Sequence, residues 1–226
     1  MRVLVVDVGG THIKLAIAGT RRILKIDSGP DLTASRMVRD VLRATSAWQY
    51  DVVTIGYPGP VRHDRPLEEP HNLGGGWKRC NYAEKFGKPV RIVNDAAMQA
   101  LGSYQGGRML FLGLGTGLGS AVIDRGRLEP LELAHLPYKD GLEYEDFLGT
   151  RGLKRLGRKT WRRHVGTVAE LLRRGLICDY VVLGGGNVKQ MVAMPPHCRR
   201  GDNANAFRGG GRVWTEHDTL RVRPVR

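Results

Sequence analysis

Two glycine-rich turns, each preceded by an apolar run, limit the folds open to this chain more than any other feature. The first turn lies in DVGGTHIK, residues 7–14, and follows the apolar residues 3–6. The second lies in GLGTGLGS, residues 113–120, and follows the apolar residues 109–112. Strand-type residues follow each turn at once, so each segment predicts a β-hairpin and not a strand followed by a helix. Two such hairpins predict a duplicated α/β fold with a central cleft.

Glycines in such turns let backbone N–H groups approach a phosphate group, and a threonine adds a hydroxyl donor. The candidate phosphate-contacting residues are Gly9, Gly10, Thr11, Gly115, Thr116 and Gly117. Asp7 is placed to hold Mg²⁺ through water, and Lys14 to offset phosphate charge. The P-loop pattern is absent, and Leu118 stands where the Rossmann pattern requires glycine. A hairpin turn without a ligand also needs glycine, so this structural explanation stays open for the first turn.

The stretch PVRIVNDAA, residues 89–97, predicts a buried strand that leads directly into a helix. Asn94 and Asp95 therefore stand at the carboxyl end of a strand, which is where open α/β sheets bind their ligands. Asp95 is also well placed to cap the following helix, which would be a purely structural role.

Further elements are predicted on both sides of this stretch. Residues 31–46 predict a helix with Asp31 or Thr33 as its cap, residues 51–55 predict a strand, and residues 56–61 predict a turn. The tail, residues 194–226, predicts an ordered loop with a final strand.

The charge balance is strongly basic. The chain has 36 Lys and Arg against 22 Asp and Glu, a net charge of +14, and much of it lies in residues 154–174 and in the last thirty residues. This balance favours polyanionic partners such as nucleic acid, polyphosphate or a nucleotide, although a solvated face without a partner would look the same. No nucleic-acid-binding module is recognisable in the sequence.

The cysteines and the hydropathy define the expected environment. Cys80, Cys178 and Cys198 are odd in number and form no CxxC pair, which disfavours a disulfide framework and a cysteine-built zinc site. No apolar run has the length of a membrane span, and the N-terminal apolar run is too short for a signal peptide. We therefore expect a cytoplasmic protein without membrane association.

Taken in order, these motifs resemble the ROK family of bacterial sugar kinases. The resemblance rests on residues 7–14, 58–61, 72–77, 93–96, 113–124, 132–135, 142–147 and 181–186. It implies the actin-like (ribonuclease H-like) fold, in which duplicated domains enclose a nucleotide in a cleft. We place the N-terminal half at residues 1–95 and the C-terminal half, with an atypical tail, at residues 96–226. Residues 181–186 are similar to the family's strand–glycine–helix adenosine motif, which implies a donor role for Gly184 and Gly185.

The resemblance also implies a hexose site. The family's Asn-Asp pair is matched by Asn94 and Asp95, with Asp95 as the catalytic base. The family's Glu-x-Gly-His motif is matched by ELAH at residues 132–135, with alanine in place of glycine. A later glutamate of the family is best matched by Glu145, and Glu143 is the competing choice. The implied sugar-binding residues are Gly59, Asn72, Asn94, Asp95, Glu132, His135 and Glu145.

Two departures from the family pattern are informative. Most ROK proteins carry a CxCGxxGC zinc site after the histidine motif, whereas this chain has PYKDGL at residues 137–142. No zinc is therefore expected, and His135 is expected to orient sugar hydroxyls. The bacterial polyphosphate glucokinase branch also lacks this zinc site, and the chain resembles that branch most. The tail differs from the closing helix that most kinases of this fold pack against the adenosine site.

The expected activity is transfer of a phosphoryl group from ATP or polyphosphate to the 6-hydroxyl of glucose or a similar hexose, with Mg²⁺. The alternatives are a non-catalytic ROK-like sugar sensor and a kinase for mannose or an N-acetylated hexosamine. The resemblance is also compatible with a homodimer.

Overall fold

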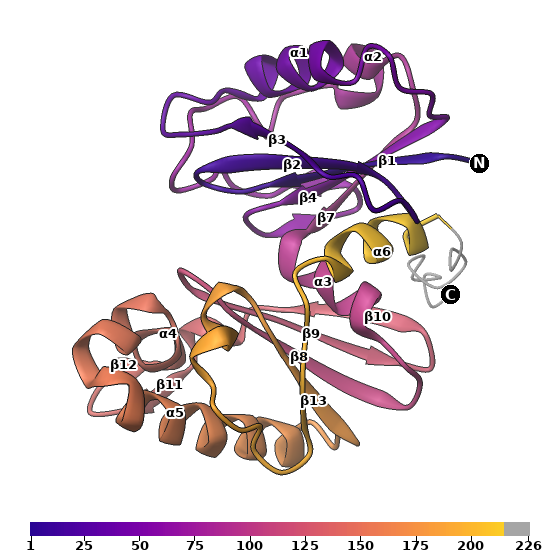
Figure 1. The fold of residues 1–226 in the computed structure, drawn as a ribbon. Helices are drawn as coiled ribbons and strands as arrows, with labels where there is room; N and C mark the ends of the chain where they lie inside the picture. The colour runs from indigo at the N-terminus through magenta and orange to yellow at the C-terminus, as the bar shows by residue number, and fades with distance from the viewer. Residues whose placement is uncertain (215–226) are drawn as a thin grey trace, which may run out of the picture.

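The computed structural model describes residues 1–214, whose frame consists of two five-stranded sheets (Figure 1). The strands of the first sheet are β1 (Val3–Val8), β2 (His12–Ile17), β3 (Leu24–Asp27), β4 (Val52–Tyr57) and β7 (Val90–Asn94). The strands of the second sheet are β8 (Arg108–Leu114), β9 (Leu118–Asp124), β10 (Arg127–Leu131), β13 (Tyr180–Gly184) and β14 (Cys198–Arg200). Both predicted hairpins are confirmed, since β1 pairs antiparallel with β2 and β8 with β9.

The two sheets repeat one topology. Their strand orders are β3-β2-β1-β4-β7 and β10-β9-β8-β13-β14. In each sheet the first three strands of the order pair antiparallel, and the last three pair parallel. The duplicated α/β fold predicted from the hairpins is therefore confirmed.

Helices and short hairpins complete the first half. The elements are α1 (Ala34–Ala44), α2 (Tyr82–Phe86), β5 (Val61–Arg62) and β6 (Arg65–Pro66). Helix α1 begins after Thr33, whose hydroxyl accepts the Arg36 N–H, as one of the two predicted caps. Strand β4 continues to Tyr57, so the turn predicted from residue 56 begins later. The reason is that Gly56 and Tyr57 remain in register with the last residues of β7.

The second half carries the helices that follow β10 and precede β13 on the outer face of its sheet (Figure 1). Its elements are η1 (Leu133–His135), β11 (Pro137–Lys139), β12 (Leu142–Glu143), α4 (Tyr144–Leu148), α5 (Thr150–Gly175) and η2 (Gly186–Gln190). Trp161 and Val165 of α5 pack in one apolar core with Leu110 of β8. Helix α5 is bent at Gly157, whose φ of 72° interrupts the helical backbone. None of the helices in residues 1–214 combines the length and the hydropathy needed to cross a membrane.

Two helices occupy the space between the sheets, α3 (Asp95–Ser103) and α6 (Asn205–Arg212) (Figure 1). They share one apolar core with Val5 of β1 and Phe111 of β8, so this core belongs to both halves. The helices approach so closely that a Cβ on Gly102 would collide with the Asn205 carbonyl. A Cβ on Gly209 would likewise collide with the Met98 carbonyl. Glycine at these two positions is therefore a requirement of helix packing.

The tail prediction is wrong for residues 205–212, which form α6 and not a loop or a strand. Three successive glycines disfavour a helix by intrinsic propensity. Here they let the helix backbone lie against its neighbours: Thr54 Oγ1 donates to the Gly210 carbonyl at 2.7 Å, and Trp214 Nε1 donates to Thr54 Oγ1 at 2.9 Å. Tertiary packing therefore overrides the local preference. Residues 215–226, the remainder of the predicted tail, lie outside the described residues.

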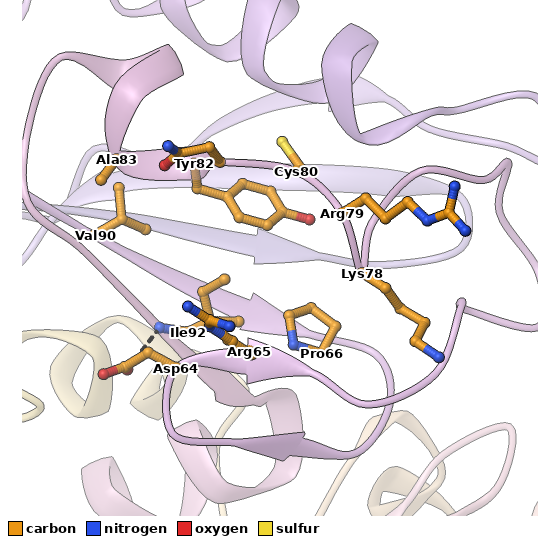
Figure 2. A pocket seen from close by; sticks show the side chains of 11 residues that line it. Asp64, Arg65, Pro66, Lys78, Arg79, Cys80, Tyr82, Ala83, Val90 and Ile92 are labelled. Atoms are coloured by element: carbon orange, nitrogen blue, oxygen red, sulfur yellow. Dashed lines mark hydrogen bonds between the residues drawn. The ribbon is translucent and has the colours of Figure 1, made fainter.

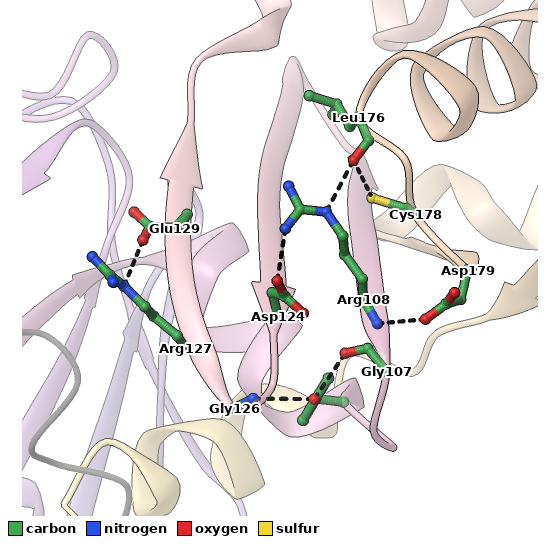
Figure 3. Close-up of polar contacts among 10 residues, drawn as sticks. Gly107, Arg108, Asp124, Gly126, Arg127, Glu129, Leu176, Cys178 and Asp179 are labelled. Carbon is green, nitrogen blue, oxygen red and sulfur yellow. Dashed lines mark hydrogen bonds and ion pairs between the residues drawn. The ribbon is translucent and has the colours of Figure 1, made fainter.

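The end of the second sheet opposite to its glycine turn is held by a set of polar contacts around Arg108 (Figure 3). The Arg108 guanidinium donates to the Leu176 carbonyl and to Asp124, and its backbone N–H donates to Asp179. Each charge in this set has a partner, so the cluster fastens β8 to β9 and to the loop before β13.

We expect Gly209→Ala to lower the free energy of unfolding by about 2–3 kcal/mol, because the new Cβ must push α6 away from α3. Gly175→Ala, at the end of α5, is the control, since a Cβ there meets no neighbouring atom. Urea unfolding of both variants measures the difference. Equal stability of the two variants would show that the helix contact is loose.

Candidate functional site

Asn94 organises the junction between β7 and α3. Its side-chain oxygen accepts the N–H groups of Ala96 at 2.9 Å and Ala97 at 3.1 Å, and its amide donates to the Gly59 carbonyl at 3.0 Å. The prediction that Asp95 caps the helix is therefore corrected: Asn94 is the N-cap, and Asp95 is the first helical residue. The cap on Asn94 leaves Asp95 available for another role.

Asp95 lies in a partly buried, electronegative environment. Its Oδ1 atom accepts only the adjacent Ala96 N–H, at 2.7 Å, among the hydrogen bonds of the described residues. Burial, followed by repulsion from Asp7 and more weakly from Glu132, raises the pKa of Asp95 to about 7. A carboxyl group with a pKa near neutrality can accept and release a proton under ordinary conditions.

The first glycine turn connects β1 to β2 beside Asp95. The Gly9 N–H donates to the His12 carbonyl at 3.1 Å, which closes the turn. A Cβ on Gly10 would meet no atom within 4 Å, and Thr11 is exposed, so this side of the turn is open to a ligand. Asp7, at the end of β1, forms a salt bridge of 3.3 Å with Lys14.

The second glycine turn is enclosed by three other segments. The N–H and the hydroxyl of Thr150, at the start of α5, donate to the Gly115 carbonyl, and so does the Asn187 amide at 2.9 Å. Gly185 has a φ of 80°, and a Cβ there would collide with the Leu114 backbone. Gly184 and Gly185 therefore adjoin the turn formed by Gly115, Thr116 and Gly117, as a shared donor site requires. The segment after them is η2, a short 3-10 helix in place of a regular α-helix.

Glu145 and Glu143, the two candidates for the family's later sugar-binding glutamate, have different partners. Glu143 pairs with His135, with 2.9 Å between Oε2 and Nδ1. Glu145 instead accepts the Leu118 N–H at 3.1 Å and lies against Gly117 in the second glycine turn. The hydrogen bond to Glu143 raises the pKa of His135. The assignment of the sugar contact to Glu145 or Glu143 therefore stays a prediction.

Glu132 interacts with charged groups from both halves of the chain. Partial burial, with repulsion from Glu68 and Glu145, raises the pKa of Glu132, while His135 opposes this shift. Glu69, the residue after Glu68 in sequence, accepts the Trp77 N–H at 2.9 Å and thereby holds the loop that contains Asn72. Asn72 itself is exposed on that loop.

A pocket of about 570 Å³ lies away from this cluster, between the β5–β6 hairpin and the segment that leads into α2 (Figure 2). Arg65, Lys78 and Arg79 line it, and Asp64 accepts the Ile92 N–H beside it at 3.1 Å. It contains none of the predicted site residues. The candidate site is therefore the region between the two glycine turns and not this pocket.

Sequence reasoning missed Thr150, Asn187 and Glu68. The first two hold the second glycine turn from segments 35 and 72 residues away, and no periodicity or motif spacing reveals such a contact. Glu68 is one of two adjacent glutamates at residues 68 and 69. That pair was the only signal in the sequence that could have drawn attention to it.

The carboxylates of the candidate site suit an Mg²⁺ ion that also binds water and substrate phosphates, and not one held by protein ligands alone. Residues 1–214 contain no group of three His, Cys, Asp or Glu side chains that would hold a metal ion by themselves. Mg²⁺ at phosphate sites keeps several waters and takes one or two carboxylates together with substrate phosphates. Asp7, which raises the pKa of Asp95 by its charge and adjoins the first glycine turn, fits this kind of site.

The repeated sheets and the two glycine turns define an actin-like fold, and solved structures agree. The polyphosphate/ATP-glucomannokinase of Arthrobacter sp. strain KM matches with a TM-score of 0.79 at 21% identity, over 96% of this chain and 99% of that chain. A ROK family glucokinase from Streptomyces griseus matches with a TM-score of 0.73 at 20% identity, over 94% of this chain and 99% of that one. The ROK family model matches residues 3–129, and the chain belongs to the ROK family.

Curated relatives give more specific similarities. The polyphosphate glucokinase of Mycobacterium leprae is 28% identical over 80% of this chain, and the match spans 62% of that protein's length. The Mycobacterium tuberculosis polyphosphate glucokinase is 29% identical over 80% of this chain and 76% of its own length. The N-acetylmannosamine kinase of Pasteurella multocida is 29% identical over 57% of this chain and 48% of its own length.

We expect Asn94→Ala to destabilise the protein by about 1–3 kcal/mol, because it removes the cap of α3 and the hydrogen bond to Gly59. Asn81→Ala, which removes the cap of α2 on the outer side of the first sheet, is the matched control. Thermal unfolding measures both losses. Unchanged stability of Asn94→Ala would contradict the capping role.

The raised pKa of Asp95 predicts a pH-dependent stability effect. A carboxyl group whose folded pKa lies above its unfolded value disfavours the folded state once it ionises, so stability falls as pH rises from about 4 to about 7. Asp95→Asn removes this cost, since the amide oxygen can still accept the Ala96 N–H. The variant should therefore have a higher Tm than the wild type at pH 8 and an equal Tm near pH 4. A lower Tm at pH 8 would contradict the buried, repelled carboxylate.

Proposed function

We propose that this chain transfers a phosphoryl group from ATP or polyphosphate to the 6-hydroxyl of glucose or a similar hexose. One observation carries the proposal: Asp95, with a pKa near neutrality, stands at a strand end beside Asp7, next to the first glycine turn. The second glycine turn adjoins it as well, because a Cβ on Gly119 would approach the Ala96 Cβ to 2.5 Å. The similarity to polyphosphate glucokinases supports the same activity.

Asp95 acts as the general base in this proposal. It accepts the proton of the 6-hydroxyl while that oxygen bonds to the terminal phosphorus and the bond from phosphorus to the rest of the donor breaks. Asn94 fixes the position of Asp95 through its bonds to α3 and to Gly59. Glu132, His135, and Glu145 or Glu143 hold the sugar hydroxyls, with Gly59 and Asn72 from the first half.

The two glycine turns bind the donor. Gly10 and Thr11 offer backbone and hydroxyl donors from the first half, and Thr116 and Gly117 offer them from the second. Gly9 and Gly115 shape the turns, because their own N–H groups donate within them. Gly184 and Gly185 adjoin the second turn, where the adenosine of ATP would lie. Lys14 offsets phosphate charge, and Asp7 would hold Mg²⁺ through water. When bound, Mg²⁺ neutralises the phosphate oxygens in such a reaction. Closure of the two halves excludes water from the reaction.

A different sugar is the second candidate, because the Pasteurella multocida relative is an N-acetylmannosamine kinase. Mannose or an N-acetylated hexosamine would occupy the same site and use the same base. A non-catalytic sugar sensor is the remaining alternative. It would bind the sugar without needing the raised pKa of Asp95.

A cytoplasmic homodimer is the form in which we expect the enzyme to work.

Product formation from glucose, Mg²⁺ and either ATP or long-chain polyphosphate tests the proposal directly. We expect glucose 6-phosphate, with kcat/KM rising with pH up to a plateau above about 7, as Asp95 ionises. Asp95→Asn should lose at least about a hundredfold in kcat while still binding glucose. Asp27→Asn, an exposed carboxylate at the end of β3, is the control for the substitution.

Three results would count against the assignment. Retained turnover by Asp95→Asn would exclude Asp95 as the base. Faster phosphorylation of mannose or N-acetylmannosamine than of glucose would move the substrate to the second candidate. Absence of product with every sugar and donor would favour the sensor.

A further inference from the structure

We propose that a polyphosphate chain extends from the second glycine turn along the line where η2 meets α5, held by Lys154, Arg158 and Lys189. We call these three residues the seam cations. The proposal rests on the proposed function for the identity of the donor, but its binding surface follows from contacts and charges that the phosphoryl-transfer site does not use.

The line of contact between η2 and α5 is fixed at both ends. At the end next to the glycine turn, the Asn187 amide donates both to the Gly115 carbonyl and to Thr150 Oγ1, at 2.9 Å each. At the other end, Arg162 Nε donates to the Gln190 carbonyl at 2.5 Å. The contact therefore begins at the donor-binding turn and leads away from it.

The seam cations follow this line. Lys154 is one helical turn after Thr150, so it lies on the face of α5 that meets Gly115. Arg158 is one helical turn before Arg162, on the face that meets Gln190, and Lys189 directly precedes Gln190 in η2. All three side chains belong to exposed residues. Lys154 and Arg158 lie on α5, on the two sides of its bend at Gly157, and Lys189 lies on η2.

The positive charge of this surface is not neutralised by acidic residues within the same segment. Residues 150–169 contain seven Lys and Arg and no Asp or Glu. None of the seam cations forms a salt bridge with another described residue. By contrast, Arg151 pairs with Asp146 at 3.2 Å, and Arg155 donates to the Asp146 carbonyl and covers the Phe147 ring. Only part of the basic segment is therefore available to an external anion.

A long polyphosphate chain matches this surface better than ATP does. It carries negative charge at every unit, so each additional phosphate can meet another cation along the path. The adenosine of ATP is uncharged, and its expected place is at Gly184 and Gly185, before η2. Removal of the seam cations should therefore weaken the binding of long-chain polyphosphate more than the binding of ATP.

The test compares the wild type with the triple variant Lys154→Gln/Arg158→Gln/Lys189→Gln. The matched control, Lys85→Gln/Lys88→Gln/Arg43→Gln, removes the same number and type of exposed charges from the first half. We measure direct binding of long-chain polyphosphate at several salt concentrations, and KM and kcat for long-chain polyphosphate, tripolyphosphate and ATP.

We expect the seam variant to raise the Kd and KM for long-chain polyphosphate about tenfold, with kcat and the KM for ATP within twofold of wild type. Tripolyphosphate should be affected less than the long chain. The salt dependence of log Kd should lose about 2 from its slope, because three fewer cations release counterions from the single-stranded polyanion. The control should match the wild type.

Equal losses in the seam and control variants would overturn the proposal, since net charge alone would then explain binding. An unchanged Kd in the seam variant would overturn it as well. If the wild type makes product with ATP and does not bind polyphosphate, the seam is wrong while the proposed kinase stands. If polyphosphate binding is lost in the seam variant while no sugar is phosphorylated, the seam stands and the kinase proposal fails.

Discussion

The contact between α3 and α6 is where the two halves of the molecule are joined. It brings helix backbones together at Gly102 and Gly209, at a separation that excludes any Cβ. The surrounding core takes side chains from strands of both sheets, including Val5 and Phe111. The first residue of α3 is Asp95, so the helix that joins the halves also carries the proposed base. A change in this helix pair would therefore move the site and the sheets together.

The electrostatic properties of the site follow from this placement. Two carboxylates oppose the ionisation of Asp95: Asp7, near the end of the first half's central strand, and Glu132, from the second half. The Ala96 N–H of its own helix opposes this shift in part, by a hydrogen bond of 2.7 Å to Asp95 Oδ1. Burial, together with repulsion from charges that lie 88 and 37 residues away in sequence, raises the pKa of Asp95 to about 7. The duplication of the fold brings these charges together.

The successes and errors of prediction from sequence have a common physical origin. The two hairpins and the strand before Asn94 were predicted correctly, because strand periodicity and turn glycines act over a few residues. Helix α6 was missed, because its glycines serve contacts with Met98 and Val5 that local sequence does not reveal. Asp95 was also considered as a possible cap of α3, since Asn94 and Asp95 are both good capping types. The structure identifies Asn94 as the cap, because its side-chain oxygen accepts the Ala96 and Ala97 N–H groups.

Local sequence was thus sufficient for the two hairpins, the strand before Asn94 and the duplicated topology, because these depend on periodicity and turn chemistry. The contacts of Thr150 and Asn187 with Gly115, the separate partners of Glu143 and Glu145, and the raised pKa of Asp95 arise only when distant segments meet. Hydrogen bonding, burial and charge repulsion depend on distance in space, and the linear sequence does not contain that distance.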